Sequence, residues 1–484
     1  MGEKHITKHV IVSNMFWRFG ERIFAQLATF IVSVVLARKL TTSDFGNVAL
    51  LMIFIDVANV FVIQGFSSAL VQKKNADNID FSSVFFFGLF FSLLIYGILF
   101  VISPFTVYIG NQDLSPLFRV LALRIPLAAI NSVQHAYAQK NLLFKKYFWK
   151  TLFGTVLSAC VGIYMAYSGY GAWAIVGQYL SNSICDTVLL WFFIGWRPQK
   201  AFDFNRLKEL IGFGWKMLCS GLIHVVYNRL TSFFIGTVYT TTDLAFYEQG
   251  QKMPGIIDTN VDTTINAVLF PVMAKQQDNI IAIKQMIRKS IQTSGSIIWP
   301  MMMGLAVLSD QLIEFLYGNK WLPAAIFMII ACFKLTLEPI QTANLQAVKA
   351  VGRSDIYLKM EIIKKLFGLL VIIIGVQISV LATAIAALIQ TIFASVVNGY
   401  VNRRLFNYKF KEQISDILLN ASLSLTMATI VLGIKQLNIL AGFFQMFAEI
   451  ATGIVAYAIL LYLFNRKQFA FFLSLVSHKV ENKR

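Results

Sequence analysis

Apolar runs of about 20 residues recur along almost the whole chain, from near residue 10 to near residue 464. Each run is long enough to cross a hydrocarbon core of roughly 30 Å as an α-helix. Only 14% of the residues are charged, whereas a soluble domain has about 25%. No stretch between the runs is long enough for a soluble domain. The pattern therefore predicts an all-α polytopic membrane protein.

The boundaries between apolar runs and charged loops predict about fourteen transmembrane helices. Their approximate ranges are 10–37, 45–70, 81–103, 115–138, 148–167, 171–194, 208–238, 244–273, 287–316, 322–348, 357–374, 378–401, 414–433 and 442–464.

Lys and Arg are distributed unequally between the two sides of this predicted topology. The N-terminus, the even-numbered loops and the C-terminal tail hold about 28 of them, and the odd-numbered loops hold about four. Cytoplasmic loops of membrane proteins carry the excess of Lys and Arg. We therefore expect both termini in the cytoplasm, with residues 72–80, 196–206 and 402–413 cytoplasmic and 105–113 and 168–171 external.

The chain also repeats itself at a spacing of roughly 200 residues. The matching strings are FGER (19–22) with FGWK (213–216), TTSDFG (41–46) with TTTDLA (240–245), and LSP (114–116) with WLP (321–323). Six spans lie in each copy, so the two halves run in the same direction, as parallel repeats of transporters do. Chance matching of short strings is the alternative. We expect pseudo-symmetric six-helix lobes at 1–206 and 207–402, and two extra helices and a cytoplasmic tail at 403–484.

The sequence lacks the motifs of a catalytic site. HExxH, GxSxG, GxxxxGK[ST] and kinase-type motifs are all absent, so we expect neither an enzyme nor a cofactor. The four cysteines lie inside apolar runs without the spacing of metal ligands, so we expect no metal site. The net charge of +18 comes mainly from basic residues in short loops, which is a topology signal, so we expect no nucleic-acid partner.

Charged residues inside the predicted spans are the candidates for a functional site. A charge at a helix centre costs at least about 2.5–3.5 kcal/mol and usually faces a cavity or a partner. The substrate-binding candidates are Arg18, Arg22, Arg124, Lys216, Arg229, Lys252 and Lys334, and the coupling-ion candidates are Asp56, Glu248, Asp258 and Asp262. Two alternatives stay open: Arg18 reaches the cytoplasmic interface by snorkelling, or the cations pair with Glu21, Glu248, Asp258 or Asp262 to hold helices together.

The eighth span carries a polar stripe along one helical face. Glu248, Lys252, Gly255, Thr259, Asp262 and Asn266 recur at intervals of three and four residues. A lipid-facing helix could not carry this stripe, so it lines water or forms a buried ion-pair seam with another helix. The length of the stripe favours a cavity. Pro254 and Gly255 predict a kink in this span.

Several strings resemble one transporter family. They are FWRFGERIFAQLATFIVSVVLARKLTTSDFGNVAL (16–50), GFSSALVQKK (65–74), GNKWLPA (318–324), AVGRSD (350–355) and LKMEIIKK (358–365). Their order and spacing resemble the polysaccharide-transporter branch of the multidrug/oligosaccharidyl-lipid/polysaccharide exporter superfamily, and within it the lipopolysaccharide and colanic-acid-type exporters. The resemblance covers roughly residues 10–410.

The resemblance implies two six-helix lobes around a central cavity, with the first, second, seventh and eighth spans at its walls. It implies a flippase of the bacterial cytoplasmic membrane that moves a polyprenyl-pyrophosphate-linked oligosaccharide by alternating access, for surface polysaccharide or lipopolysaccharide biosynthesis. Its partners would be that substrate, membrane lipid, and the polysaccharide polymerase and glycosyltransferases, with H⁺ or Na⁺ as the coupling ion. Two alternatives remain: an ion-coupled multidrug efflux antiporter of the same superfamily, and a membrane scaffold for polysaccharide assembly.

Overall fold

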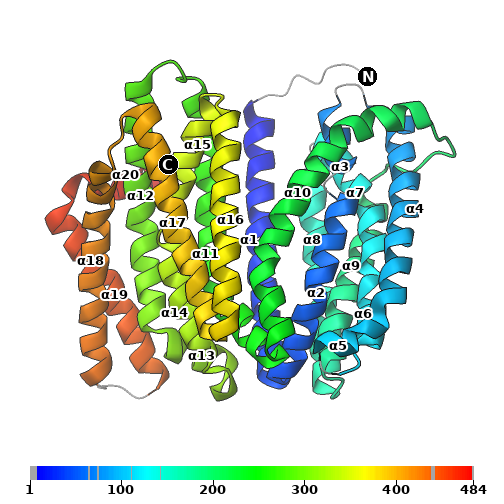
Figure 1. Ribbon diagram of the computed structural model, residues 1–484, viewed down its shortest axis with the longest axis horizontal. Coiled ribbons are helices and arrows are strands. Elements are labelled where there is room, and N and C mark those ends of the chain that lie inside the picture. Colours follow the sequence, from blue (N-terminus) through cyan, green and yellow to red (C-terminus); the bar gives the residue numbers. More distant parts are fainter. Residues whose placement is uncertain are drawn as a thin grey trace. The chain divides into compact units, whose positions relative to one another are not determined.

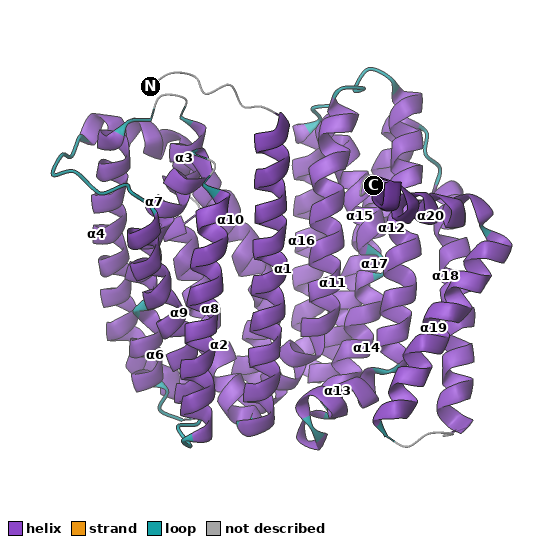
Figure 2. Ribbon diagram, turned by 180° about the vertical axis from the view of Figure 1, so that it is seen from behind, coloured by secondary structure: helices purple, strands orange, loops and turns teal. Residues whose placement is uncertain are grey.

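The computed structural model describes residues 8–63, 66–73, 76–110, 112–141, 143–437 and 442–481. Helices form almost all of this part of the chain, and it contains no strand (Figure 2). The α-helices, which are labelled in Figure 1, are α1 (Lys8–Lys39), α2 (Thr42–Ile63), α3 (Phe66–Gln72), α4 (Asn78–Ile102), α5 (Val107–Gly110), α6 (Ser115–Ala122), α7 (Arg124–Lys140), α8 (Phe144–Tyr167), α9 (Ala172–Phe193), α10 (Phe204–Val238), α11 (Thr241–Ala274), α12 (Ile280–Val307), α13 (Ser309–Tyr317), α14 (Ala324–Leu335), α15 (Glu338–Ala350), α16 (Ser354–Ile378), α17 (Val380–Phe406), α18 (Phe410–Leu437), α19 (Phe443–Phe464) and α20 (Arg466–Glu481).

The chain folds into two compact units. Unit 1 is Met1–Ala245 and contains α1 to α10 with the start of α11, and unit 2 is Phe246–Arg484 and contains the remainder. The expected boundaries of the sequence repeat, at residues 206 and 402, stay a prediction, because this division reflects packing within each unit and does not test the repeat.

Each of the fourteen expected spans falls on one helix or on two consecutive helices. Over the described residues, ten helices are long and apolar enough to cross a membrane, or eleven if α12 and α13, which bend by 71°, form one broken span. Large apolar side chains such as Phe90 (66% exposed), Val101 (73%) and Ile378 (71%) cover outer faces, as helices in contact with lipid require. The all-α polytopic membrane fold is confirmed, and the number fourteen stays a prediction.

The fourth and tenth expected spans are each broken into two helices, and a proline accounts for both breaks. Proline has no N–H to donate to the carbonyl four residues earlier. The carbonyl that Pro126 leaves without its helical donor belongs to Ala122, the last residue of α6, and the one that Pro339 leaves belongs to Leu335, the last residue of α14. Pro254 and Pro271 lie inside α11, and Pro300 lies inside α12, without ending these helices. The helix α11 therefore continues past Pro254 and Gly255, where the sequence predicts a kink.

Contacts between loops support the alternation of sides within each unit. In unit 1, Arg206 Nη1 lies 2.5 Å from Asp77 Oδ2, which joins the second and sixth loops, and Lys140 Nζ donates to the Lys73 carbonyl, which joins the second and fourth. In unit 2, Lys284 bonds Glu412, which joins the eighth and twelfth loops. The hydrogen bond from Arg206 also lowers the pKa of Asp77.

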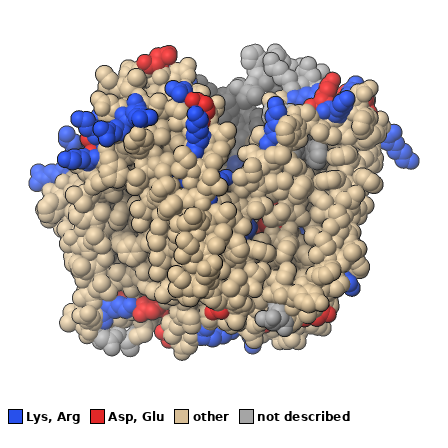
Figure 3. Space-filling model, in the orientation of Figure 1, with Lys and Arg blue, Asp and Glu red and all other residues tan. Residues whose placement is uncertain are grey.

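The opposite ends of the helices carry the odd-numbered loops. Lys39 Nζ lies 4.4 Å from the ring centroid of Tyr167, which joins the first and fifth loops of unit 1. Lys435 Nζ donates to Asp310 Oδ1 at 2.6 Å, which joins the thirteenth loop to α13, the helix that leads into the ninth loop of unit 2. In Figure 3, blue Lys and Arg atoms predominate at the upper end of each unit, and a broad band with little charge lies below them.

Two of the strings that match in sequence form the same local structure. At the start of α2, Asp44 N donates to Thr41 Oγ1 at 3.1 Å, and Thr41 N donates back to Asp44 Oδ2 at 3.0 Å. At the start of α11, Asp243 N and Thr240 N make the same two bonds at 3.1 and 3.2 Å. Both are capping boxes, which satisfy backbone N–H groups at a helix start. The superposition of the two halves stays a prediction.

Glycines allow two pairs of antiparallel helices to pack closely. A Cβ atom at Gly162 of α8 would lie 2.7 Å from the Gln178 Cβ of α9. A Cβ atom at Gly375 of α16 would lie 3.0 Å from the Thr383 Cα of α17. Both distances are shorter than ordinary van der Waals contact, so a side chain at either position would force the neighbouring atoms to shift.

Candidate functional site

The charged residues of α2 and α10 meet in unit 1. Arg229 Nη2 donates to Asp56 Oδ2 at 2.5 Å, and the two side chains are 37% and 24% exposed. The sequence suggested Arg229 as a substrate-binding residue and Asp56 as a coupling-ion residue, and the structure joins them in one ion pair. Asp56 was absent from the partners that the sequence suggested for the cations, because only the packing of α2 on α10 brings it there.

A polar pocket of about 440 Å³ surrounds this ion pair. Its polar side chains are Asp56, Asn59, His224, Asn228 and Arg229. His224 Nε2 and Asn228 Nδ2 lie 3.0 Å apart, one turn of α10 from each other. The pocket offers a guanidinium that is paired with the Asp56 carboxylate, two amides and an imidazole, and the N–H groups among them can donate hydrogen bonds to a phosphate or sugar oxygen.

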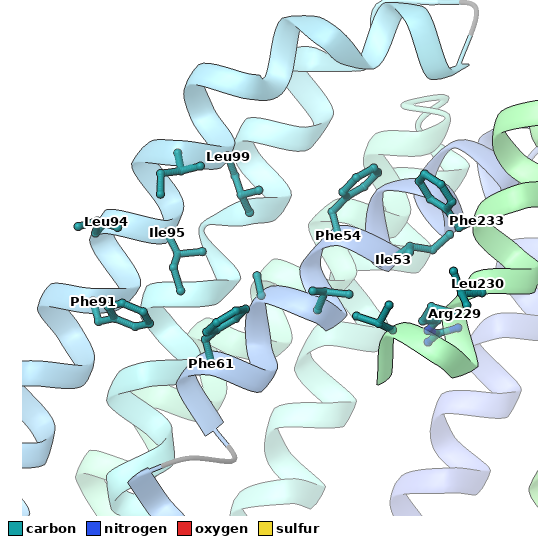
Figure 4. A pocket seen from close by; sticks show the side chains of 14 residues that line it. Ile53, Phe54, Phe61, Phe91, Leu94, Ile95, Leu99, Arg229, Leu230 and Phe233 are labelled. Atoms are coloured by element: carbon teal, nitrogen blue, oxygen red, sulfur yellow. The ribbon is translucent and has the colours of Figure 1, made fainter. Parts of the chain in front are cut away.

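A second pocket, of about 570 Å³, adjoins the first and is almost wholly apolar. It lies between α2, α4 and α10, and Figure 4 shows Phe54 and Phe61 of α2, Phe91 and Leu99 of α4, and Phe233 of α10 at its walls. Arg229 lines this pocket as well and, among the described residues, is the one that borders both. Sequence analysis did not find the apolar pocket, because its residues are indistinguishable from ordinary lipid-facing or core residues.

The charges of α1 contact α8 of the same unit. Arg18 Nη1 donates to Glu21 Oε2 at 3.0 Å, and its guanidinium carbon lies 5.3 Å from the ring centroid of Tyr147. Thr151 Oγ1 donates to the other oxygen of Glu21 at 3.2 Å. The Arg18 side chain is 48% exposed, and Arg22 is half-buried one turn further on. The Arg18–Glu21 ion pair therefore lies within α1 and does not itself join two helices, and snorkelling of Arg18 to the cytoplasmic interface stays a prediction.

Sequence analysis missed a buried ion pair between α8 and α9. Lys150 Nζ lies 2.9 Å from Asp186 Oδ2, and the Lys150 side chain is only 3% exposed. Lys150 was placed at the start of a span, where a lysine usually reaches the interface. Asp186 is the only charged residue in the expected span 171–194, and this signal, a carboxylate inside an apolar run, could have identified it.

Arg124 and Lys216 lie away from the polar pocket's lining. Arg124 Nε donates to Ser183 Oγ of α9 at 3.3 Å, and its guanidinium carbon lies 4.9 Å from the ring centroid of Tyr179. Lys216 is exposed on α10, about 20 Å along the helix from Arg229. The structure thus gives Arg124 partners on α9 and does not bring Lys216 to the Arg229 pocket.

In unit 2, part of the polar stripe of α11 bonds to α15. The Asp262 carboxylate accepts hydrogen bonds from Thr342 of α15 and, at 2.8 Å, from Asn266 Nδ2. Asn266 Oδ1 accepts one from Gln346 of α15 at 2.5 Å. This end of the stripe therefore hydrogen-bonds to neutral side chains of α15, whereas the alternative that the sequence offered was a seam of ion pairs.

The other charged candidates of unit 2 lie between the start and the middle of α11, and on α14. Lys334 Nζ of α14 donates to Gln251 Oε1 of α11 at 3.2 Å. Glu248, Lys252 and Asp258 are all half-buried. Whether this part of the stripe faces a water-filled cavity stays a prediction. In the described part of the chain, no group of three or more His, Cys, Asp or Glu side chains could hold a metal ion.

Comparison of the sequence with known proteins finds similarity to polysaccharide biosynthesis proteins. The profile of the family described as "Polysaccharide biosynthesis protein" matches residues 35–326. The succinoglycan biosynthesis transport protein ExoT of Rhizobium meliloti is 23% identical over 353 residues, which are 72% of this chain and 71% of ExoT. The teichuronic acid biosynthesis protein TuaB of Bacillus subtilis is 25% identical over 419 residues, which are 84% of this chain and 85% of TuaB.

Solved structures with the same fold are membrane transporters. The lipid II flippase MurJ, in an inward closed conformation, matches with a TM-score of 0.75 at 16% identity, over 93% of this chain and 99% of MurJ. An inward-facing multidrug resistance transporter of the MATE family matches with a TM-score of 0.56 at 14% identity, over 79% of this chain and 94% of the transporter. At these identities the likeness concerns the fold alone.

Proposed function

Because the chain belongs to the family of polysaccharide biosynthesis proteins, we propose that it is a flippase for a polyprenyl-pyrophosphate-linked oligosaccharide. It moves the sugar repeat unit across the membrane by alternating access, for surface polysaccharide or lipopolysaccharide biosynthesis. The family membership confirms the resemblance found in the sequence. The printed names of ExoT and TuaB, which refer to succinoglycan and teichuronic acid biosynthesis, support a polysaccharide precursor as the cargo.

The pocket around Arg229 and Asp56 is the observation that carries this proposal. A pyrophosphate with its sugars cannot cross roughly 30 Å of hydrocarbon without a polar route. The guanidinium of Arg229 belongs to the candidate membrane span Gly214–Val238, and guanidinium groups bind phosphate oxygens through paired, charge-assisted hydrogen bonds. The apolar pocket next to it distinguishes the site from one for a free sugar, since the cargo carries a hydrocarbon chain.

The remaining parts of the proposal concern the cell. We expect the protein in the bacterial cytoplasmic membrane, next to the glycosyltransferases that build its cargo and the polymerase that uses it. H⁺ or Na⁺ would drive transport through acidic residues among Asp56, Glu248, Asp258 and Asp262. No catalytic step is proposed, because flipping breaks no covalent bond.

Transport by the purified protein in liposomes tests the function. We expect a fluorescent polyprenyl-pyrophosphate-linked oligosaccharide to become accessible to an external quencher only in vesicles that contain the protein. Vesicles without protein are the control. Uptake of a cationic dye in exchange for H⁺ or Na⁺, without flipping of the lipid-linked sugar, would instead establish the multidrug antiporter. Activity toward neither compound would favour the scaffold.

The distribution of Lys and Arg predicts the orientation, with both termini cytoplasmic. In a variant without the four native cysteines, we expect Ser168→Cys to react with an impermeant maleimide on intact cells. Lys200→Cys should react only after the membrane is permeabilised, because the 196–206 loop is cytoplasmic. Labelling of Lys200→Cys from outside would reverse the assigned orientation.

A further inference from the structure

The apolar pocket between α2, α4 and α10 opens toward the lipid. Leu94 and Ile98 of α4 line it and are 46% and 49% exposed, so its outer edge faces the hydrocarbon. Its volume of about 570 Å³ lies within the roughly 300–1,000 Å³ of pockets that bind small molecules. Lipid chains are as apolar as the pocket, so apolar contact alone would not select one lipid over another. Selection requires a polar anchor at one end.

Arg229 provides that anchor, because it borders the apolar pocket on one side and the polar pocket on the other. In the polar pocket the guanidinium bonds Asp56, and the amides of Asn59 and Asn228 lie around the pair. The ligand that fits both pockets at once is an amphiphile, with an anionic head beside Arg229 and a hydrocarbon chain between α2, α4 and α10. A free sugar phosphate would use only the polar pocket.

The depth of Arg229 in the membrane decides which of two classes of anionic lipid can bring its phosphate to this residue. Arg229 lies nine residues before the end of α10 at Val238, which is about 14 Å of helix and therefore near the middle of a core of roughly 30 Å. A bilayer phospholipid keeps its phosphate at the membrane surface. A lipid-linked sugar in transit has to bring its pyrophosphate past the middle of the membrane, so its phosphate can reach Arg229.

We propose that the apolar pocket between α2, α4 and α10 holds the isoprene units nearest the pyrophosphate of the polyprenyl carrier while the pyrophosphate contacts Arg229. This inference rests on the proposed function and assigns the lipid part of the cargo to unit 1. The isoprene units nearest the pyrophosphate then contact the protein in the apolar pocket while the pyrophosphate lies beside Arg229.

Photo-crosslinking of the full chain in nanodiscs tests the proposal. The probe is geranylgeranyl pyrophosphate with a diazirine on its first isoprene unit, and labelled peptides are identified by mass spectrometry. We expect saturable labelling on α2, α4 or α10 that unlabelled geranylgeranyl pyrophosphate prevents and phosphatidylglycerol does not. Arg229→Ala should reduce labelling on the order of tenfold or more, because a charge-assisted contact is lost.

A matched pair of α4 variants tests the pocket itself. Ile95 lines the pocket, whereas Leu93 is 51% exposed on the same helix and does not line it. Ile95→Trp should fill the pocket and reduce labelling, and Leu93→Trp should leave it unchanged. Labelling of the wild-type protein needs neither variant, so the proposal stays testable if Ile95→Trp fails to fold.

Three results would overturn the inference. Labelling on other helices, or no saturable labelling, in protein that flips the lipid-linked sugar would place the chain elsewhere and leave the proposed function standing. Equal competition by phosphatidylglycerol would identify the occupant as ordinary bilayer lipid. A failure of the proposed function can be distinguished from these results, because wild-type protein would then not flip the lipid-linked sugar in the liposome assay.

Discussion

Asp186→Asn should strongly destabilise the folded protein, because it leaves the Lys150 ammonium without its carboxylate partner. The Lys150 side chain is 3% exposed, and its Nζ lies 2.9 Å from Asp186. Removing one member of a buried ion pair costs about 3–5 kcal/mol, since the other charge stays buried and uncompensated. We expect a lower thermal unfolding temperature in detergent and a lower abundance in the membrane.

A second substitution at Lys150 identifies the cause. Lys150→Met combined with Asp186→Leu removes both charges, and buried ion pairs can often be replaced by apolar residues without loss of stability. The double variant should therefore recover most of the stability lost in Asp186→Asn. The matched control is Asp355→Asn, which breaks the exposed pair with Arg353 and should leave stability unchanged. Equal stability of Asp186→Asn and wild type would show that the buried ion pair contributes nothing to the stability of the folded protein.

Arg229→Ala should abolish export of surface glycan and cause the lipid-linked precursor to accumulate inside the cell. Loss of one charge-assisted contact to pyrophosphate costs on the order of 1.5–3 kcal/mol, which is roughly 10- to 150-fold in affinity. Arg229→Lys should restore export only in part, because an ammonium cannot make the bidentate contact of a guanidinium. The measurements are surface glycan, precursor level and membrane abundance in a deletion strain.

The ion pair with Asp56 offers a competing structural role for Arg229, and the same measurements separate the two. A binding residue leaves membrane abundance intact when it is replaced, whereas a structural pair lowers abundance and is partly rescued by exchanging the two charges between positions 56 and 229. Arg353→Ala, at an exposed loop arginine, is the control for loss of a positive charge. Unchanged export in folded protein with alanine at Arg22, Arg229 and Lys252 together would exclude the hypothesis that these cations bind the pyrophosphate.

Much of the fold could be predicted because a bilayer constrains a sequence more strongly than water does. Helices must be apolar over about 20 residues to cross, so the fourteen expected ranges all coincide with helical segments. The capping strings at 41–44 and 240–243 were recognisable as a repeat, since a capping box is a local structure of four consecutive residues. The breaks before Pro126 and Pro339 were not predicted, because other prolines lie inside continuous helices of the same chain.

The sequence by itself determined that the chain spans the membrane, and it singled out Arg229, Asp56 and the stripe of α11 as unusual. These features depend on composition and on spacing along one helix. Only the tertiary structure decided that Arg229 pairs with Asp56, that Lys150 and Asp186 form a buried pair, and that an apolar pocket adjoins Arg229. The partners in each ion pair lie on different helices, and no local pattern specifies which helix faces will meet when the bundle packs.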